Sequence, residues 1–249
     1  MYDTGMRIIS GRFKGFEVRV PAKGTRPTTD RTKEAVFSHL ESMGMLDNTR
    51  ILDLYAGSGA LGIEALSRGA HSLVAVEMAS QAANILRTTF AQLRKHASWQ
   101  PHDSAQVVKG KAEQFPQMYA VNFGGDGADE KTDSHLVVHA NKADKANKAN
   151  KQVNEQTNKS AGSQTNQPFD VVFIDPPYAV SDEVCNALLA DLVQCGVVDR
   201  YSVIIVERSA RSPKPQEPQG WEITRAKDYG ETAVYTLEAV ENAAATNVE

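Results

Sequence analysis

The chain has little of what marks several protein classes. Its 249 residues include only two cysteines, Cys185 and Cys195, with neither CxxC nor zinc-knuckle spacing. This excludes a disulfide scaffold, and we expect two reduced thiols on one helix. No apolar run approaches the roughly 20 residues that span a bilayer, and the N-terminus lacks a signal-peptide core. We therefore expect a soluble, cytoplasmic protein without a membrane partner.

The charge is small overall but unevenly distributed. The six histidines are scattered, so we expect no metal site, and the formal net charge is −4. Between Arg7 and Lys33, however, eight Lys or Arg residues stand against two acids. This concentration fits contacts to a phosphate backbone, although a solvated basic face without a partner would have the same composition. Phe13 and Phe16 either stack on bases or fill the underside of a small sheet.

The stretch Arg50 to Ala65, RILDLYAGSGALGIEA, organises the rest of the chain. Its apolar residues from Ile51 to Leu54 predict a buried strand, and a glycine turn and a helix follow. A strand, a glycine turn and a helix N-terminus point backbone N–H groups and the positive end of a dipole at one volume. We expect a ligand site there.

Two cofactors fit this turn. Residues 57–62, GSGALG, match GxGxxG, and Glu77 lies about twenty residues further on, as in NAD-dependent enzymes. Asp53 favours S-adenosylmethionine, because a carboxylate before the glycines accepts from an ammonium group or a water and repels a pyrophosphate. Glu77 is placed to accept both ribose hydroxyls. The expected cofactor-binding residues are Asp53, Tyr55, Ala56, Gly57, Ser58, Gly59, Glu77, Met78, Lys111 and Ala112.

A second motif, Asp175-Pro176-Pro177-Tyr178, follows the continuous apolar run 171–174. Such a run is typical of a central parallel strand buried on both faces. The prolines prevent the strand from continuing and hold a carboxylate, a carbonyl and an aromatic ring in a fixed relation at the ligand edge. The expected catalytic residues are Asp175, Pro176, Pro177 and Tyr178.

Strands and helices alternate along the chain, which predicts an α/β sheet with helices on both faces. We expect a basic N-terminal β extension over 1–21, a catalytic domain over 22–240 and a flexible tail over 241–249. A polar segment at 122–168 is expected to be a disordered insertion. The predicted elements are a hairpin within 7–20, helices at 35–44, 61–66, 79–93 and 182–195, strands at 51–54, 72–77, 105–108, 171–174 and 202–207, and a terminal hairpin of 221–224 with 232–237.

Five segments together resemble the RsmD family: MRIISGRFKG, RPTTDRTKEAVF, LDLYAGSGALGIEALSRGA, VAVE and VFIDPPY. The resemblance implies a Rossmann-like class I methyltransferase sheet that uses S-adenosyl-L-methionine to methylate the N2 amine of one guanine. The implied partner is 16S ribosomal RNA, within the small subunit or an assembly intermediate, and we expect a monomer. The long insertion departs from the family pattern. The residues expected to bind RNA are Arg7, Arg12, Lys14, Arg26, Thr28, Thr29, Asp30 and Arg31.

Three other functions remain open from the sequence. Asp-Pro-Pro-Tyr also suits an adenine-N6 methyltransferase acting on DNA or RNA. GxGxxG with Glu77 suits an NAD-dependent oxidoreductase, although this leaves Asp53 and the Pro-Pro-Tyr turn without a role. A catalytically silent RNA-binding module would need only the basic segment.

Overall fold

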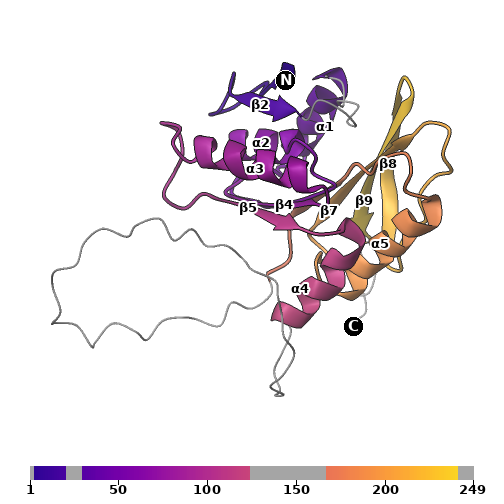
Figure 1. Ribbon diagram of the computed structural model, residues 1–249. Coiled ribbons are helices and arrows are strands. Elements are labelled where there is room, and N and C mark those ends of the chain that lie inside the picture. Colours follow the sequence, from indigo (N-terminus) through magenta and orange to yellow (C-terminus); the bar gives the residue numbers. More distant parts are fainter. Residues whose placement is uncertain (1–2, 21–29, 124–166, 241–249) are drawn as a thin grey trace, which may run out of the picture.

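A seven-stranded sheet forms the centre of the computed structural model, which describes residues 3–20, 30–123 and 167–240 (Figure 1). The strand order is β5-β4-β3-β6-β7-β9-β8, and β1 and β2 form a separate antiparallel pair. The strands are β1 (Asp3–Arg7), β2 (Glu17–Val20), β3 (Arg50–Leu54), β4 (Ser72–Glu77), β5 (Ser104–Lys109), β6 (Val171–Ile174), β7 (Val203–Ser209), β8 (Trp221–Tyr229) and β9 (Thr232–Ala239). The helices are α1 (Asp30–Ser42), α2 (Ala60–Ser67), α3 (Ser80–Leu93), η1 (Ala112–Gln114), α4 (Phe115–Phe123) and α5 (Asp182–Gln194).

Five neighbouring strands of the sheet are parallel, which brings their carboxyl ends to one edge. In the centre, Leu54 of β3 pairs with Val76 of β4 and with Ile174 of β6. All four residues of β6 are buried, as the continuous apolar run predicted. We call the side where β3, β4, β6 and β7 end the carboxyl edge; ligands of open α/β sheets bind there.

Helices cover both faces of the sheet, so the predicted fold class is confirmed (Figure 1). On one face, Phe37 of α1 packs on Phe173 of β6 with ring centroids 5.8 Å apart, and α2 and α3 cover the same face. On the other face, Phe115 of α4 and Leu189 of α5 belong to a second core cluster with Val172. The predicted terminal hairpin is longer than expected, and it extends the sheet because β9 pairs with β7.

The short helices η1 and α4 between β5 and β6 were not predicted. Residues 122–123, which we assigned to the insertion, are the last residues of α4. The boundary was wrong because α4 is only nine residues long and runs straight into polar sequence. Residues 124–166 of the predicted insertion and the tail 241–249 lie outside the described residues, whereas 167 and 168 are described and form neither helix nor strand.

The N-terminal segment is an integral part of the core. Ile8, Phe13 and Val18 are buried and belong to the same cluster as the helices on that face of the sheet. Phe13 stacks on Trp99 with centroids 6.3 Å apart and meets the His96 ring edge-on. Phe13 therefore fills the underside of the small sheet and is not available to a base.

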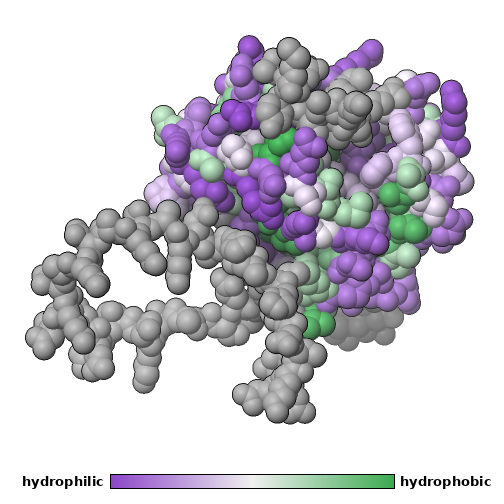
Figure 2. Space-filling model, in the orientation of Figure 1, coloured by the Kyte–Doolittle hydropathy of each residue, from purple (hydrophilic) through white to green (hydrophobic). Residues whose placement is uncertain are grey.

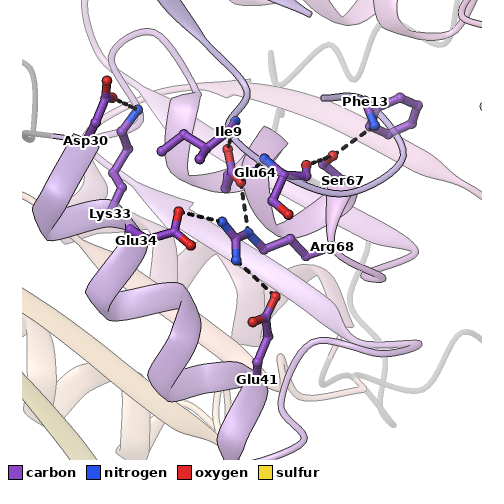
Figure 3. Close-up of polar contacts among 10 residues, drawn as sticks. Ile9, Phe13, Asp30, Lys33, Glu34, Glu41, Glu64, Ser67 and Arg68 are labelled. Atoms are coloured by element: carbon purple, nitrogen blue, oxygen red, sulfur yellow. Dashed lines mark hydrogen bonds and ion pairs between the residues drawn. The ribbon is translucent and has the colours of Figure 1, made fainter. Parts of the chain in front are cut away.

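A buried carboxylate fastens this segment to α2 (Figure 3). Glu64 is fully buried and accepts hydrogen bonds from the Ile9 amide at 2.8 Å and the Ser10 amide at 3.0 Å. It also pairs with Arg68 at 2.8 Å, and the same guanidinium reaches Glu34 and Glu41 of α1. The sequence EALSR thus ties the N-terminal segment and α1 to α2.

Hydrophilic residues cover most of the face seen in Figure 2. Within the ranges that the structure describes, no helix combines the length and apolar character needed to cross a bilayer. Cys185 lies buried in α5 and Cys195 directly follows that helix, and both are free thiols, as predicted.

Candidate functional site

Three acidic residues meet at the carboxyl edge. Asp53 is the penultimate residue of β3, Glu77 is the last residue of β4, and Asp175 directly follows β6. Leu54 pairs with Val76 and with Ile174, and Glu77 and Asp175 directly follow these two partners. Both acids therefore lie at the same edge as the end of β3. The negative charges of Asp175 and Glu77 are close enough to Asp53 to contribute to the raised pKa of its carboxyl group. The two sequence motifs therefore share one site.

Asp53 is a buried acid whose protonation changes near neutral pH. Its side chain is almost fully enclosed, and its Oδ2 accepts the Gly62 amide at 3.0 Å. Burial, followed by repulsion from Asp175 and Glu77, raises the pKa of Asp53 to about 7, and the Gly62 hydrogen bond opposes this shift. The carboxyl group therefore holds the first turn of α2 and offers little surface for direct contact with a ligand.

The turn after β3 requires left-handed backbone at three positions. Tyr55, Gly57 and Gly59 have φ of 60°, 54° and 77°. Glycine is strongly favoured at position 59, because φ is 77° and a Cβ there would lie 2.5 Å from Leu86 Cδ2. Tyr55 adopts this backbone at a cost on the order of 1 kcal/mol. Its hydroxyl donates to Glu113 Oε1 at 2.8 Å, and burial followed by this hydrogen bond raises the pKa of Tyr55.

Glu77 joins the loops after β3 and β4. Its Oε2 accepts the Gly57 amide at 2.9 Å and its Oε1 accepts the Ala79 amide at 2.6 Å. Next to it, Met78 is 61% exposed. Lys111 is exposed after β5, whereas Ala112 is buried. The predicted cofactor residues thus lie on three consecutive loops at one edge.

The Asp-Pro-Pro-Tyr loop is anchored by a residue that sequence reasoning missed. Arg208 of β7 is nearly buried, and its guanidinium donates to the Val180 carbonyl at 3.1 Å and to Asp182 Oδ1 at 2.7 Å. These bonds hold the chain just after Tyr178, which is 66% exposed. In the sequence, the only indication of this anchoring role is that an arginine follows the apolar run of a predicted strand.

A pocket beside this loop contains a second carboxylate that was also missed. Glu207 lies next to Asp175, because Val206 pairs with Ile174 in the parallel register. Both acids line the pocket, whose other walls are apolar residues of α1, α2, β6 and β7. These residues are Val36, Leu61, Phe173, Ile174 and Ile205. The available signal was that the predicted strand SVIIVE ends in glutamate as SLVAVE does, although β7 itself continues to Ser209.

Among the expected RNA contacts, Arg12 is used inside the fold. Its guanidinium forms two hydrogen bonds to Asp103, at 2.7 and 2.9 Å, and two to the Leu66 and Ala70 carbonyls at 3.0 Å. It contacts the C-terminal end of α2, which is opposite the carboxyl edge. Arg12 is therefore not available as an RNA contact. Its ion-pair partner, Asp103, is 91 residues away in the chain, so no local pattern in the sequence indicated this pair.

The other predicted basic residues differ in position. Arg7 is exposed and pairs with Glu17 at 3.1 Å, and Lys14 is exposed in the turn near Arg12. Arg31 is exposed at the start of α1, where Asp30 pairs with the buried Lys33 at 3.0 Å. Arg26, Thr28 and Thr29 lie outside the described residues.

In the described ranges, no three His, Cys, Asp or Glu side chains are grouped in a way that could hold a metal ion.

Comparisons with known proteins agree with this architecture. A family model described as conserved hypothetical protein 95 matches residues 6–123 and 128–238. The ribosomal RNA small subunit methyltransferase D of Escherichia coli K12 is 29% identical, over 94% of this chain and 91% of its own length. The protein of that name from Haemophilus influenzae is 28% identical, over 90% and 89%. The solved structure of yhhF from Escherichia coli has a TM-score of 0.64 at 24% identity and covers 95% and 99% of the two chains.

Proposed function

Because this chain belongs to the conserved hypothetical protein 95 family, which is the RsmD family, we propose that it methylates ribosomal RNA of the small subunit with S-adenosylmethionine. The acceptor is the exocyclic N2 amine of a guanine in 16S RNA. The observation that carries the choice of base is the pair of carboxylates, Asp175 and Glu207, in one pocket.

The electrostatics of the carboxyl edge fit this methyl donor. Glu77 and Asp175 place negative charge beside Asp53, and their repulsion adds to the effect of burial in raising the pKa of Asp53 to about 7. A negative site stabilises a sulfonium and an ammonium group, and it repels the pyrophosphate of NAD. Each Glu77 oxygen also retains a lone pair that can accept a ribose hydroxyl. When bound, S-adenosylmethionine supplies an electrophilic methyl group whose carbon–sulfur bonding pair stays with sulfur.

The two carboxylates favour guanine over adenine. The Watson–Crick edge of guanine presents two adjacent donors, N1–H and the N2 amine, whereas adenine presents a donor amine beside the N1 lone pair. Ionised carboxylates only accept hydrogen bonds, so Asp175 and Glu207 match the guanine edge. Against adenine, one of them would face a lone pair, and that mismatch would cost binding energy. This argues against the adenine-N6 alternative.

The residues of the loop would then activate and hold the amine. The N2 lone pair is delocalised into the ring, so acceptors that hold its hydrogens favour a more pyramidal, more nucleophilic nitrogen. The Asp175 carboxylate and the Pro176 carbonyl are the proposed acceptors, and Asp175 can take the proton that the nitrogen loses. Pro177 sets the turn, and the exposed Tyr178 ring would stack on the base. Positioning and charge supply most of the acceleration.

The base must be unpaired or turned out of its helix to reach this pocket. We infer that the substrate is 16S RNA in a small-subunit particle, that the enzyme works in the cytoplasm, and that it acts as a monomer. Arg7 and Arg31 would contact neighbouring phosphates, whereas Lys14, in the turn near Arg12, lies away from this pocket.

Nucleoside mass spectrometry tests the proposal. The full chain is incubated with S-adenosylmethionine and small ribosomal subunits that carry an unmethylated target, and the RNA is digested. We expect N2-methylguanosine, and the Asp175→Ala protein serves as the negative control. N6-methyladenosine as the product would establish the rival activity, and an unmodified RNA pool would refute the proposal.

A further inference from the structure

The edge strand β8 changes the direction of its side chains halfway along. Trp221 pairs with Ala239 and Ile223 with Leu237, but Arg225 then pairs with Thr236, so Thr224 is an extra residue. A β-bulge of this kind re-aims the side chains that follow it. Trp221 and Ile223 pack in the core cluster that contains α5.

After the bulge, the side chains lie on the opposite face of the sheet. Arg225, Lys227 and Tyr229 line a second pocket together with His39 of α1. Because the side chains of a regular strand alternate with period two, these three residues would lie with Trp221 on the α5 face if β8 ran through Thr224 without a bulge. The bulge therefore places a basic strand beside α1.

This basic strand adjoins the proposed base pocket. The two pockets share Val36 and Ile205 as walls. The register also aligns Lys227 with Val234 of β9, and Val234 with Glu207 of β7. Lys227 is thus two strand spacings, about 10 Å, from Glu207 along the sheet.

Two cations, Arg225 and Lys227, line the pocket beside α1. In the part of the chain that the structure describes, neither Arg225 nor Lys227 forms an ion pair, and the Lys227 ammonium lies 6.0 Å from the Tyr229 ring. Burial and then the positive charge of Arg225 lower the pKa of His39, and Glu238 opposes the shift. The Glu238 carboxylate also accepts the Thr224 hydroxyl.

We propose that Arg225 and Lys227 of β8 bind phosphates of the RNA that flanks the target nucleotide. The inference rests on the proposed function and adds a second RNA contact, far in sequence from the basic N-terminal segment. A pocket with two carboxylates repels an incoming phosphate backbone, so productive docking needs cations close to it. The Lys227 side chain, about 10 Å from Glu207, and the neighbouring Arg225 would meet the backbone while the base points to Asp175.

The test compares two double variants of the full chain. Arg225→Gln/Lys227→Gln removes the proposed contacts. Arg87→Gln/Lys95→Gln removes two exposed cations, one in the middle of α3 and one just after it, as a charge-matched control. The affinity for a 16S RNA fragment is measured from 50 to 200 mM salt, with the affinity for S-adenosylmethionine and the melting temperature measured in parallel. Lys227→Gln alone keeps the test valid if the Arg225 change lowers the melting temperature.

We expect the β8 variant to bind RNA on the order of tenfold more weakly, with the slope of log K against log salt reduced by about one per cation removed. The affinity for S-adenosylmethionine should stay at the wild-type value. RNA affinity and slope equal to those of the control variant would overturn the inference. If wild-type protein methylates no RNA, the proposed function itself fails; if it methylates RNA and the β8 variant behaves as the control, only this inference fails.

Discussion

The Glu77 carboxylate accepts the Gly57 amide at 2.9 Å, so one side chain at the end of β4 fixes the glycine turn after β3. Its other oxygen accepts the Ala79 amide at 2.6 Å. The two loops that are expected to hold the nucleoside and the methionine moiety are therefore built around the same carboxylate.

Replacing Glu77 by alanine should weaken S-adenosylmethionine binding by about ten- to a hundredfold, because charge-assisted hydrogen bonds of about 1.5–3 kcal/mol are lost. Isothermal titration calorimetry measures this, with Glu222→Ala on the exposed side of β8 as the control. A wild-type dissociation constant in the Glu77 variant would remove this residue from the cofactor site.

Asp53 should make stability depend on pH. Its pKa in the folded protein, about 7, is above the ordinary value of 3.8, so the folded state binds more protons between these values. The free energy of unfolding therefore falls as pH rises from about 4 to about 7, by at most about 1.4 kcal/mol per pH unit. Asp53→Asn removes this contribution and keeps an acceptor for the Gly62 amide. Relative to wild type, the variant should gain stability between pH 5 and pH 8 in urea unfolding; an unchanged difference would contradict the raised pKa.

Asp175→Ala should abolish methyl transfer and leave cofactor binding intact, because the amine loses its principal acceptor while the glycine turn keeps Asp53 and Glu77. Single-turnover transfer of labelled methyl to RNA, alongside calorimetry with S-adenosylmethionine, separates these effects. Turnover at the wild-type rate would exclude Asp175 from the mechanism.

The local elements could be read from the sequence because each has its own signal. Apolar runs predict β3, β4 and β6, and parallel pairing of β3 with β6 predicts that Asp53 lies near Asp175. The contacts that determine where individual site residues lie join residues that are far apart in the sequence. Arg12 meets Asp103 across 91 residues, Glu207 reaches the pocket only through the β6–β7 register, and one bulge at Thr224 decides which face Arg225 occupies.

Glu207 should determine the choice of base. Glu207→Ala is expected to lower kcat/KM on the guanine target by about ten- to a hundredfold, since the N1–H donor loses a charged acceptor. Glu207→Gln should recover part of this loss, because its amide carbonyl still accepts. Steady-state kinetics with RNA as the varied substrate measures both variants, with the affinity for S-adenosylmethionine as the internal control. Equal kcat/KM for wild type and the alanine variant would show that the second carboxylate does not read the base.

Glu64 should be the residue on which the attachment of the N-terminal segment depends. Glu64→Ala leaves the Ile9 and Ser10 amides without their acceptor and removes the buried partner of Arg68, at an expected cost of about 3–5 kcal/mol in the free energy of unfolding. Glu41→Ala is the matched control: its carboxylate is 49% exposed and pairs with the same guanidinium, so its loss should cost below about 1 kcal/mol. Urea denaturation at pH 7 compares the two, and equal costs would show that the buried carboxylate contributes no more than a surface ion pair. The family motif EALSR would then need an explanation other than holding residues 6–18 on α2.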